Sequence, residues 1–121
     1  MLLVDTSVWI DHFRRTSGSL ASLLEMDEVA IHPFVLGELA CGNLANRKEL
    51  IALLHTLPHV TKVGDDEFLL FLERHSLMGR GLGLIDVHLV ASCHLDGCPL
   101  WTKDKRLHTI ATEMGIEFSQ P

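Results

Sequence analysis

Residues 1–15 read MLLVDTSVWIDHFRR, and this stretch predicts how the fold begins. The apolar run 2–4 is typical of a short buried strand, and it closes at Asp5. Thr6 or Ser7 can cap a helix that continues to residue 15, because a side-chain oxygen at that position accepts a free backbone N–H. The chain therefore opens with a strand that turns directly into a helix, with an acid at the junction.

The same alternation of strand and helix continues along the whole chain. Further strands are expected at residues 28–32, 59–63 and 98–102, with a possible edge strand at 116–119. Helices are expected at residues 20–26, 34–42, 46–57, 65–77, 85–97 and 105–115. Strands separated by helices indicate a parallel sheet. The sequence therefore predicts a single α/β domain over residues 1–121, with a central parallel sheet of four to five short strands flanked by helices.

Four acids occupy the positions that this arrangement gathers at one edge: Asp5, Glu38, Asp86 and Asp104. Ligands of open α/β sheets bind outside the carboxyl ends of the strands. Each acid also has a structural explanation. Asp5 can cap a helix, Asp86 lies in a first helical turn and Asp104 can start the last helix. Glu38 stands among apolar residues, where a buried carboxylate is rare unless it is paired or ligated. One shared site explains the four together better than four separate accidents.

Carboxylates held close together repel one another unless a cation or proton neutralises them. A site with only oxygen ligands suits Mg²⁺, with Mn²⁺ as an alternative. Such ions can make a water nucleophilic and stabilise the leaving oxygen of a phosphodiester. Thr6 and Thr102 carry hydroxyls beside the acids and can orient a carboxylate or a metal-bound water. The constellation therefore indicates metal-assisted phosphodiester chemistry.

Any binding of nucleic acid needs a local basic patch, or an oligomer that builds one, because the net charge of the chain is −6. Candidates lie close to the acids, since a phosphate backbone near carboxylates needs cations. The alternative for each is ordinary solvated surface. The candidate RNA-binding residues are Arg14, Arg15, Arg80, Lys103, Lys105 and Arg106.

Three cysteines cannot form a complete disulfide framework, and reduced thiols in the core of a cytoplasmic protein are expected. The apolar stretches are too short for a membrane span, and the start lacks a basic region typical of a secretory signal. His88, Cys93, His94 and Cys98 fit no common zinc spacing, and structural roles are favoured for them.

The segments LLVDTSVWIDHF, FVLGELACG, LGLIDVHLVAS and LWTKDKRL together resemble the PIN-domain family, and within it the VapC ribonuclease toxins of bacterial toxin–antitoxin pairs. The resemblance covers residues 2 to about 110 and implies a three-layer PIN-like fold. It implies that Asp5, Glu38, Asp86 and Asp104 are the catalytic acids, with Asp5, Asp86 and Asp104 as metal ligands. Thr6 and Thr102 fall on the family's hydroxyl positions.

The same resemblance implies Mg²⁺-dependent endonucleolytic cleavage of structured RNA, a homodimer and a small cognate antitoxin. Trp9, Ile10 and Phe13, with apolar residues of the segment 46–57, can supply a dimer interface or can be intramolecular core. Three other functions deserve comparison. A phosphatase using Asp5 as nucleophile is weakened by Ser7, which stands where a second Asp belongs, and a phospho-accepting receiver module fits poorly. A metal-binding RNA-recognition protein without turnover stays open.

Overall fold

The computed structural model describes residues 1–15 and 18–119, and within these ranges it contains a three-stranded sheet and seven helices. The strands are β1 (Leu2–Val4), β2 (Val29–Ala30) and β3 (Leu100–Trp101). The helices are α1 (Thr6–Arg15), α2 (Ser19–Glu25), α3 (Pro33–Cys41), α4 (Arg47–His55), α5 (Asp65–Arg74), α6 (Leu84–Asp96) and α7 (Lys105–Glu113). The expected α/β class is confirmed.

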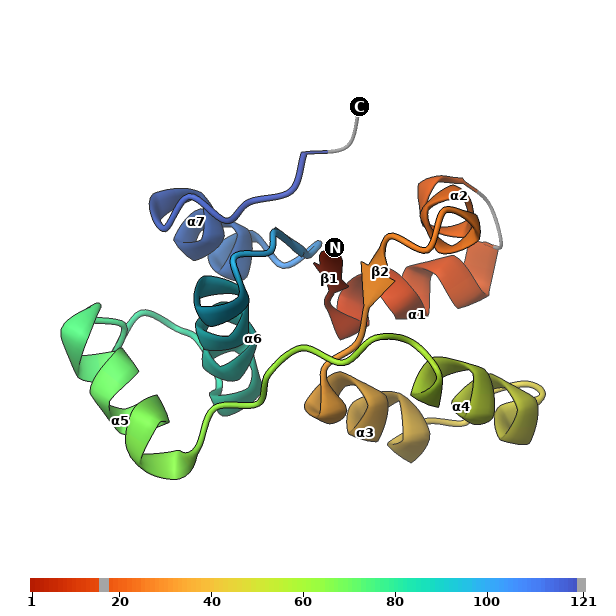
Figure 1. Cartoon of the computed structure of the whole chain (residues 1–121), viewed down its shortest axis with the longest axis horizontal. Coiled ribbons are helices and arrows are strands. Elements are labelled where there is room, and N and C mark those ends of the chain that lie inside the picture. Colours follow the sequence, from red (N-terminus) through yellow and green to blue (C-terminus); the bar gives the residue numbers. More distant parts are fainter. Residues whose placement is uncertain (16–17, 120–121) are drawn as a thin grey trace.

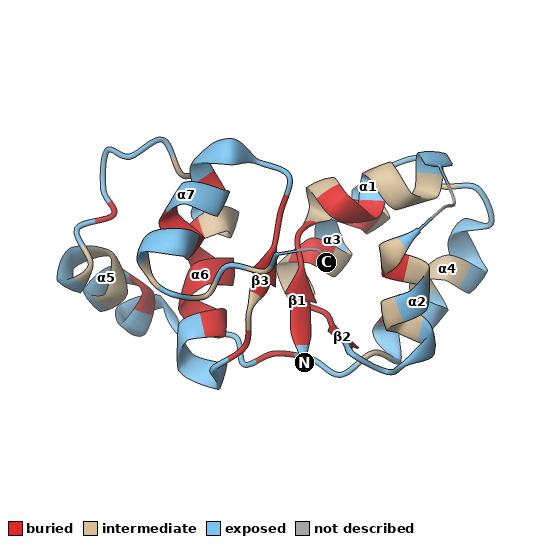
Figure 2. Ribbon diagram, turned by 90° about the horizontal axis from the view of Figure 1, so that it is seen from above, coloured by how far each residue is buried: buried red, intermediate tan, exposed pale blue. Residues whose placement is uncertain are grey.

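The sheet is parallel, in the order β2-β1-β3, so the strand that begins the chain lies in the middle. Leu3 pairs with Ala30 on one side and with Leu100 on the other. Helices cover both sides of the sheet: α1 to α4 lie on one side and α5 to α7 on the other (Figures 1 and 2). Because β1 is paired on both edges and wholly buried, its last residue fixes the position of Asp5.

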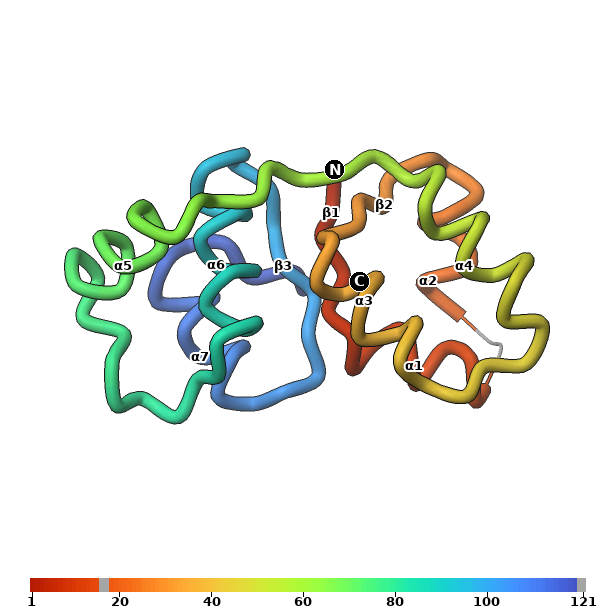
Figure 3. The backbone as a smooth tube through the Cα atoms, turned by 90° about the horizontal axis from the view of Figure 1, so that it is seen from below, coloured from red at the N-terminus to blue at the C-terminus, as the bar shows by residue number. Residues whose placement is uncertain are grey.

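The expectation of four to five strands is only partly met. Where a strand was expected over residues 59–63, the described chain forms a single parallel bridge, between Ile31 and His59. The likewise expected edge strand at 116–119 is reduced to a bridge between Leu100 and Glu117. The neighbouring β2 is short, and Pro33 begins α3 just beyond it. A strand this short leaves its neighbour little backbone to pair with. Figure 3 follows the segment between α4 and α5 as it passes β2 toward the other group of helices.

Helix α6 carries the largest buried stretch, with seven consecutive buried residues from Val87 to Cys93. This stretch has no exposed face, because the sheet covers one side of α6 and α5 packs on another (Figure 2). His88 belongs to this core, since its ring stacks on Phe68 at 4.4 Å between centroids. The structural role expected for His88 is therefore the one observed.

Trp9 packs α1 against the core. Its side chain is 1% exposed, and its ring centroid lies 5.9 Å from that of Phe13. Trp9 therefore belongs to the intramolecular core, and its suggested part in a dimer interface is wrong. Ile10, on the same helix, is 38% exposed. Among the described residues, no helix is long and apolar enough to cross a membrane.

Candidate active site

Asp5 lies at the carboxyl end of the central strand, where it is 7% exposed. Its backbone N–H donates to the carbonyl of Trp101 at 2.9 Å, which ties it to β3. Its Oδ2 accepts two hydrogen bonds of 2.7 Å, from the hydroxyls of Ser7 and Thr102. Two neutral donors hold the buried carboxylate in one orientation without neutralising its charge.

Glu38 lies on α3 and reaches the end of β1 at which Asp5 lies. Thr6 Oγ1 donates to Glu38 Oε1 at 2.6 Å, so the first turn of α1 orients this carboxylate. Glu38 is exposed, although its apolar neighbours in the sequence suggested burial. The inference from burial was wrong because α3 buries mainly Val35 and Leu39, while position 38 lies beside that buried stripe, where the side chain reaches solvent.

Asp86 and Asp104 each stabilise the start of a helix as well. Asp86 Oδ2 accepts the backbone N–H of Gly83 at 3.0 Å at the start of α6. Asp104 Oδ1 accepts the N–H of Leu107 at 3.0 Å and caps α7. The N–H of Asp104 donates to Thr102 Oγ1 at 3.0 Å, which links Asp104 to the hydroxyl that binds Asp5. Both acids therefore stabilise the start of a helix, as expected. This role does not move either acid away from the edge of the sheet at which Asp5 lies.

The electrostatics of Asp86 show that the four acids share one neighbourhood. Its pKa is raised above the ordinary value of 3.8, first because burial disfavours the charged form. The hydrogen bond from Gly83 opposes this shift. The negative charges of Asp5, Asp104 and Glu38 add to it. Like charges that act on one another in this way favour either a bound proton or a compensating cation.

The donor set fits an oxygen-seeking divalent ion. Within the described part of the chain, each of the four acids engages one carboxylate oxygen in hydrogen bonds and leaves its second oxygen without a protein donor. Carboxylate oxygens are what Mg²⁺ and Mn²⁺ prefer. In residues 1–15 and 18–119 no three His, Cys, Asp or Glu side chains are gathered tightly enough to grip an ion as they stand. An ion held by three of these carboxylates at once would need at least one of them to rotate, whereas an ion held by one or two carboxylates and waters would not.

Ser7 is a site residue that sequence reasoning missed. Its Oγ donates to Asp5 Oδ2 and accepts the backbone N–H of Lys103 at 3.1 Å, so it joins α1 to the segment that follows β3. Its hydroxyl also lies 3.5 Å from that of Thr102. The sequence signal was its position two residues after a strand-ending Asp, which was interpreted only as a helix cap.

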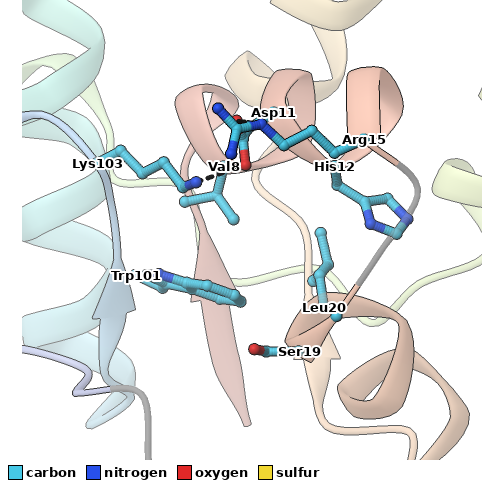
Figure 4. Close-up of a pocket in the computed structure, with 9 residues that line it drawn as sticks. Val8, Asp11, His12, Arg15, Ser19, Leu20, Trp101 and Lys103 are labelled. Carbon is cyan, nitrogen blue, oxygen red and sulfur yellow. Dashed lines mark hydrogen bonds and ion pairs between the residues drawn. The ribbon is translucent and has the colours of Figure 1, made fainter.

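The basic candidates are unequally placed. Lys103 Nζ pairs with Asp11, and Arg15 Nε lies 3.2 Å from the same carboxylate, beside a cavity of about 210 Å³ (Figure 4). Lys103 lowers the pKa of Asp11 through this hydrogen bond. Arg80 is held by Glu113 of α7 through two hydrogen bonds of 2.8 and 2.7 Å. While this pair holds, Arg80 can offer RNA only its remaining guanidinium N–H groups.

The other three candidate cations are exposed as well: Arg14, at the end of α1, and Lys105 and Arg106, in the first turn of α7. The guanidinium of Arg106 packs over Gly81, where an added Cβ would lie 2.9 Å from its Nη1. Gly81 also has a φ of +82°, which favours glycine. The glycine-rich loop that precedes α6 is thus fitted against α7.

The protein-family model described as the PIN domain matches residues 2–113. The chain therefore belongs to the PIN-domain family, and the match contains all four acids. Over 121 aligned residues the chain is 43% identical to Ribonuclease VapC32 of Mycobacterium tuberculosis, in strains CDC 1551/Oshkosh and ATCC 25618/H37Rv. The alignment covers 99% of this chain and 98% of each relative. The resemblance to VapC-type PIN ribonucleases is confirmed, and this family is generally metal-dependent.

Replacing Asp86 with Asn is expected to stabilise the protein at neutral pH. A carboxyl whose pKa is raised by folding holds its proton more tightly in the folded chain. Stability is therefore lost as the pH rises from the ordinary value of 3.8 through the raised pKa. Asn removes the charge, and its side-chain oxygen can still accept the N–H of Gly83. Urea unfolding without divalent ions should give a higher midpoint for Asp86→Asn at pH 7. The difference between the urea midpoints of the variant and the unaltered protein should become smaller at acid pH. A lower midpoint for Asp86→Asn at pH 7 would contradict repulsion between Asp86 and the other acids.

Proposed function

We propose that this protein is a metal-dependent endoribonuclease that cleaves structured RNA as the toxin of a toxin–antitoxin pair. The single observation that carries the proposal is the hydrogen-bonded acidic cluster at the carboxyl end of the sheet, where Thr102 binds both the carboxylate of Asp5 and the N–H of Asp104. The relatives named ribonuclease support the choice of RNA as substrate.

Asp5, Asp86 and Asp104 are proposed to hold the ion, which is Mg²⁺ or, alternatively, Mn²⁺. Once bound, the ion supplies an activated water and stabilises the leaving oxygen. The chain itself supplies orientation. Thr102 and Ser7 fix Asp5, the Asp104 N–H fixes Thr102, and Thr6 fixes Glu38. Glu38 completes the acidic set from α3, where its exposure lets it receive a proton from an attacking water. The hydroxyl groups act as positioning residues.

The proposed partners are the RNA substrate, a small antitoxin and a second copy of the chain. A homodimer addresses the net charge of −6, because it can align basic residues of both copies along one groove. Its interface can use the exposed Ile10 but not Trp9. We place the protein in the cytoplasm, where its RNA substrate is found. Sedimentation of the purified protein tests the dimer.

Chelation tests the function directly. EDTA should abolish cleavage of a mixed structured-RNA pool, and Mg²⁺ or Mn²⁺ in excess should restore it. Chelation-insensitive cleavage would overturn the metal-dependent mechanism. RNA binding without any cleavage in the presence of either ion would favour the alternative, a recognition protein without turnover. That alternative explains the acids less well, because carboxylates facing the substrate weaken RNA binding unless they hold a cation.

Reversing Arg14 and Arg15 together to Glu is expected to weaken RNA binding roughly tenfold at low salt, because each phosphate that the variant no longer binds keeps its counterion. The slope of log affinity against log salt should flatten by about 0.7 for each such phosphate of a single strand. Fluorescence anisotropy of labelled RNA in EDTA measures both quantities without cleavage.

The matched control reverses Lys48 and Arg74, two exposed cations on α4 and α5. This control changes the net charge of the protein by the same amount, but at positions far from the end of α1 in the sequence. If both double variants weaken binding equally, the effect is one of total charge. If neither changes affinity or slope, Arg14 and Arg15 are plain solvated surface.

A further inference from the structure

Two buried thiols outside the acidic site are brought together by the end of α6. Gly97 adopts a left-handed conformation with φ of 66° and stops the helix, and the N–H of Cys98 donates to the carbonyl of Cys93 at 3.1 Å. This is the hydrogen bond of a Schellman motif, which is frequently accompanied by a contact between the side chains of the residues at its two ends. Here those residues are both cysteines.

The surroundings of the two thiols differ in a way that suits redox chemistry. Cys93 is fully buried, and its Sγ lies 3.8 Å from the carbonyl oxygen of Pro99. Cys98 retains 6% exposure. The side-chain interaction between the two thiols raises the pKa of Cys93 and lowers that of Cys98. A thiol with a lowered pKa supplies more of the reactive thiolate, and its neighbour stands ready to resolve the product.

We propose that Cys93 and Cys98 are a redox modification site that closes reversibly to an intramolecular disulfide when the protein meets a hydroperoxide. In a reducing compartment, disulfides of this kind are usually transient. The site is distinct from the acids, which meet at the carboxyl ends of the strands, whereas Cys98 lies just before β3 begins.

The reaction balances with hydrogen peroxide as the oxidant. The Cys98 sulfur attacks one peroxide oxygen, the O–O bond breaks and one water leaves, giving a sulfenic acid on Cys98. The Cys93 sulfur then displaces the hydroxyl from the Cys98 sulfur, and the S–S bond forms as a second water leaves. The two thiol protons end in the two waters, and the peroxide takes up two electrons.

Closure should be local and should preserve the fold, because it joins residues whose backbones are already hydrogen-bonded. A cross-link restricts the unfolded chain, so the oxidised protein should resist urea better than the reduced protein. The disulfide would also connect the last turn of α6 to Cys98, the residue that precedes Pro99 and β3. Asp86 lies in the first turn of the same helix.

The experiment uses the full chain with Cys41→Ser, which removes the exposed thiol at the end of α3 and leaves only the pair. The folded, reduced protein is treated with hydrogen peroxide and digested with trypsin. The peptide 81–103 contains both remaining cysteines and no internal Lys or Arg. We expect this peptide to lose the mass of two hydrogen atoms, in a chain that forms no intermolecular disulfide. Dithiothreitol should restore the original mass. The oxidised intact protein should have a higher urea midpoint than the reduced protein.

Two comparisons decide the proposal. Cys98→Ser in the same background leaves Cys93 alone, and its thiol should react at least about tenfold more slowly than the pair, because it is buried and lacks its partner. Cys98→Ala serves instead if the Ser variant does not fold. Accumulation of sulfinic acid in place of the disulfide, or closure no faster in the folded protein than in urea, would overturn the proposal.

Discussion

Asp5→Asn is expected to lower RNA cleavage by at least about 100-fold, because the amide cannot supply the negative charge that holds the catalytic ion. The fold should persist, since the Asn oxygen can still accept the hydrogen bonds from Ser7 and Thr102. Thermal stability should be unchanged or slightly higher without divalent ions, because one of four mutually repelling charges is removed. The measurement is the initial rate of cleavage at fixed free Mg²⁺.

The matched control for this variant is Asp66→Asn. Asp66 is an exposed acid in the first turn of α5, so the control makes the same chemical change away from the acidic site. It should cleave at the rate of the unaltered protein. Equal activity of all three proteins under controlled metal would remove Asp5 from the catalytic machinery. An equal loss in both variants would show a general effect of charge.

Expression of the unaltered protein in bacteria is expected to arrest growth, and co-expression of its cognate antitoxin to restore it. The physical reason is that a catalyst turns over many RNA molecules, so a few active copies suffice. Colony counts after induction measure the effect and should fall by orders of magnitude. Asp5→Asn, produced to the same soluble level, should leave the colony count unchanged.

Two outcomes would count against this account of toxicity. Normal growth on strong expression of soluble, active protein would contradict the toxin function while leaving the ribonuclease function intact. Arrest by Asp5→Asn at the same level would mean that toxicity comes from binding or aggregation and not from cleavage.

The positions of the acids followed from the sequence because each is tied to a local signal. Asp5 directly follows a buried strand, and Asp104 begins a helix just after another. In a parallel sheet, strand ends of this kind meet at one edge whatever the remaining topology. The number of strands could not be predicted in the same way. An apolar run such as 59–63 becomes a strand only if its neighbour offers enough free backbone, and β2 does not.

Side-chain partners were harder to foresee than positions. The exposure of Glu38 depends on which side of α3 faces the core, and nine mostly apolar residues do not define one face. Arg80 was a candidate for RNA, and its bond to Glu113 joins residues 33 apart in the chain. Cys41 was expected in the core with the other thiols, yet it lies exposed at the end of α3. Each of these outcomes depends on tertiary contacts that no local pattern encodes.

The most direct test of the central claim is anomalous diffraction from crystals of the unaltered protein soaked in Mn²⁺. The account predicts one strong anomalous peak at the carboxyl end of β1, with oxygens of Asp5, Asp86 and Asp104 about 2.1–2.2 Å away or linked to the ion through water. A well-ordered crystal that binds Mn²⁺ only elsewhere, or in which these carboxylates lie more than about 10 Å apart, would contradict a shared metal site.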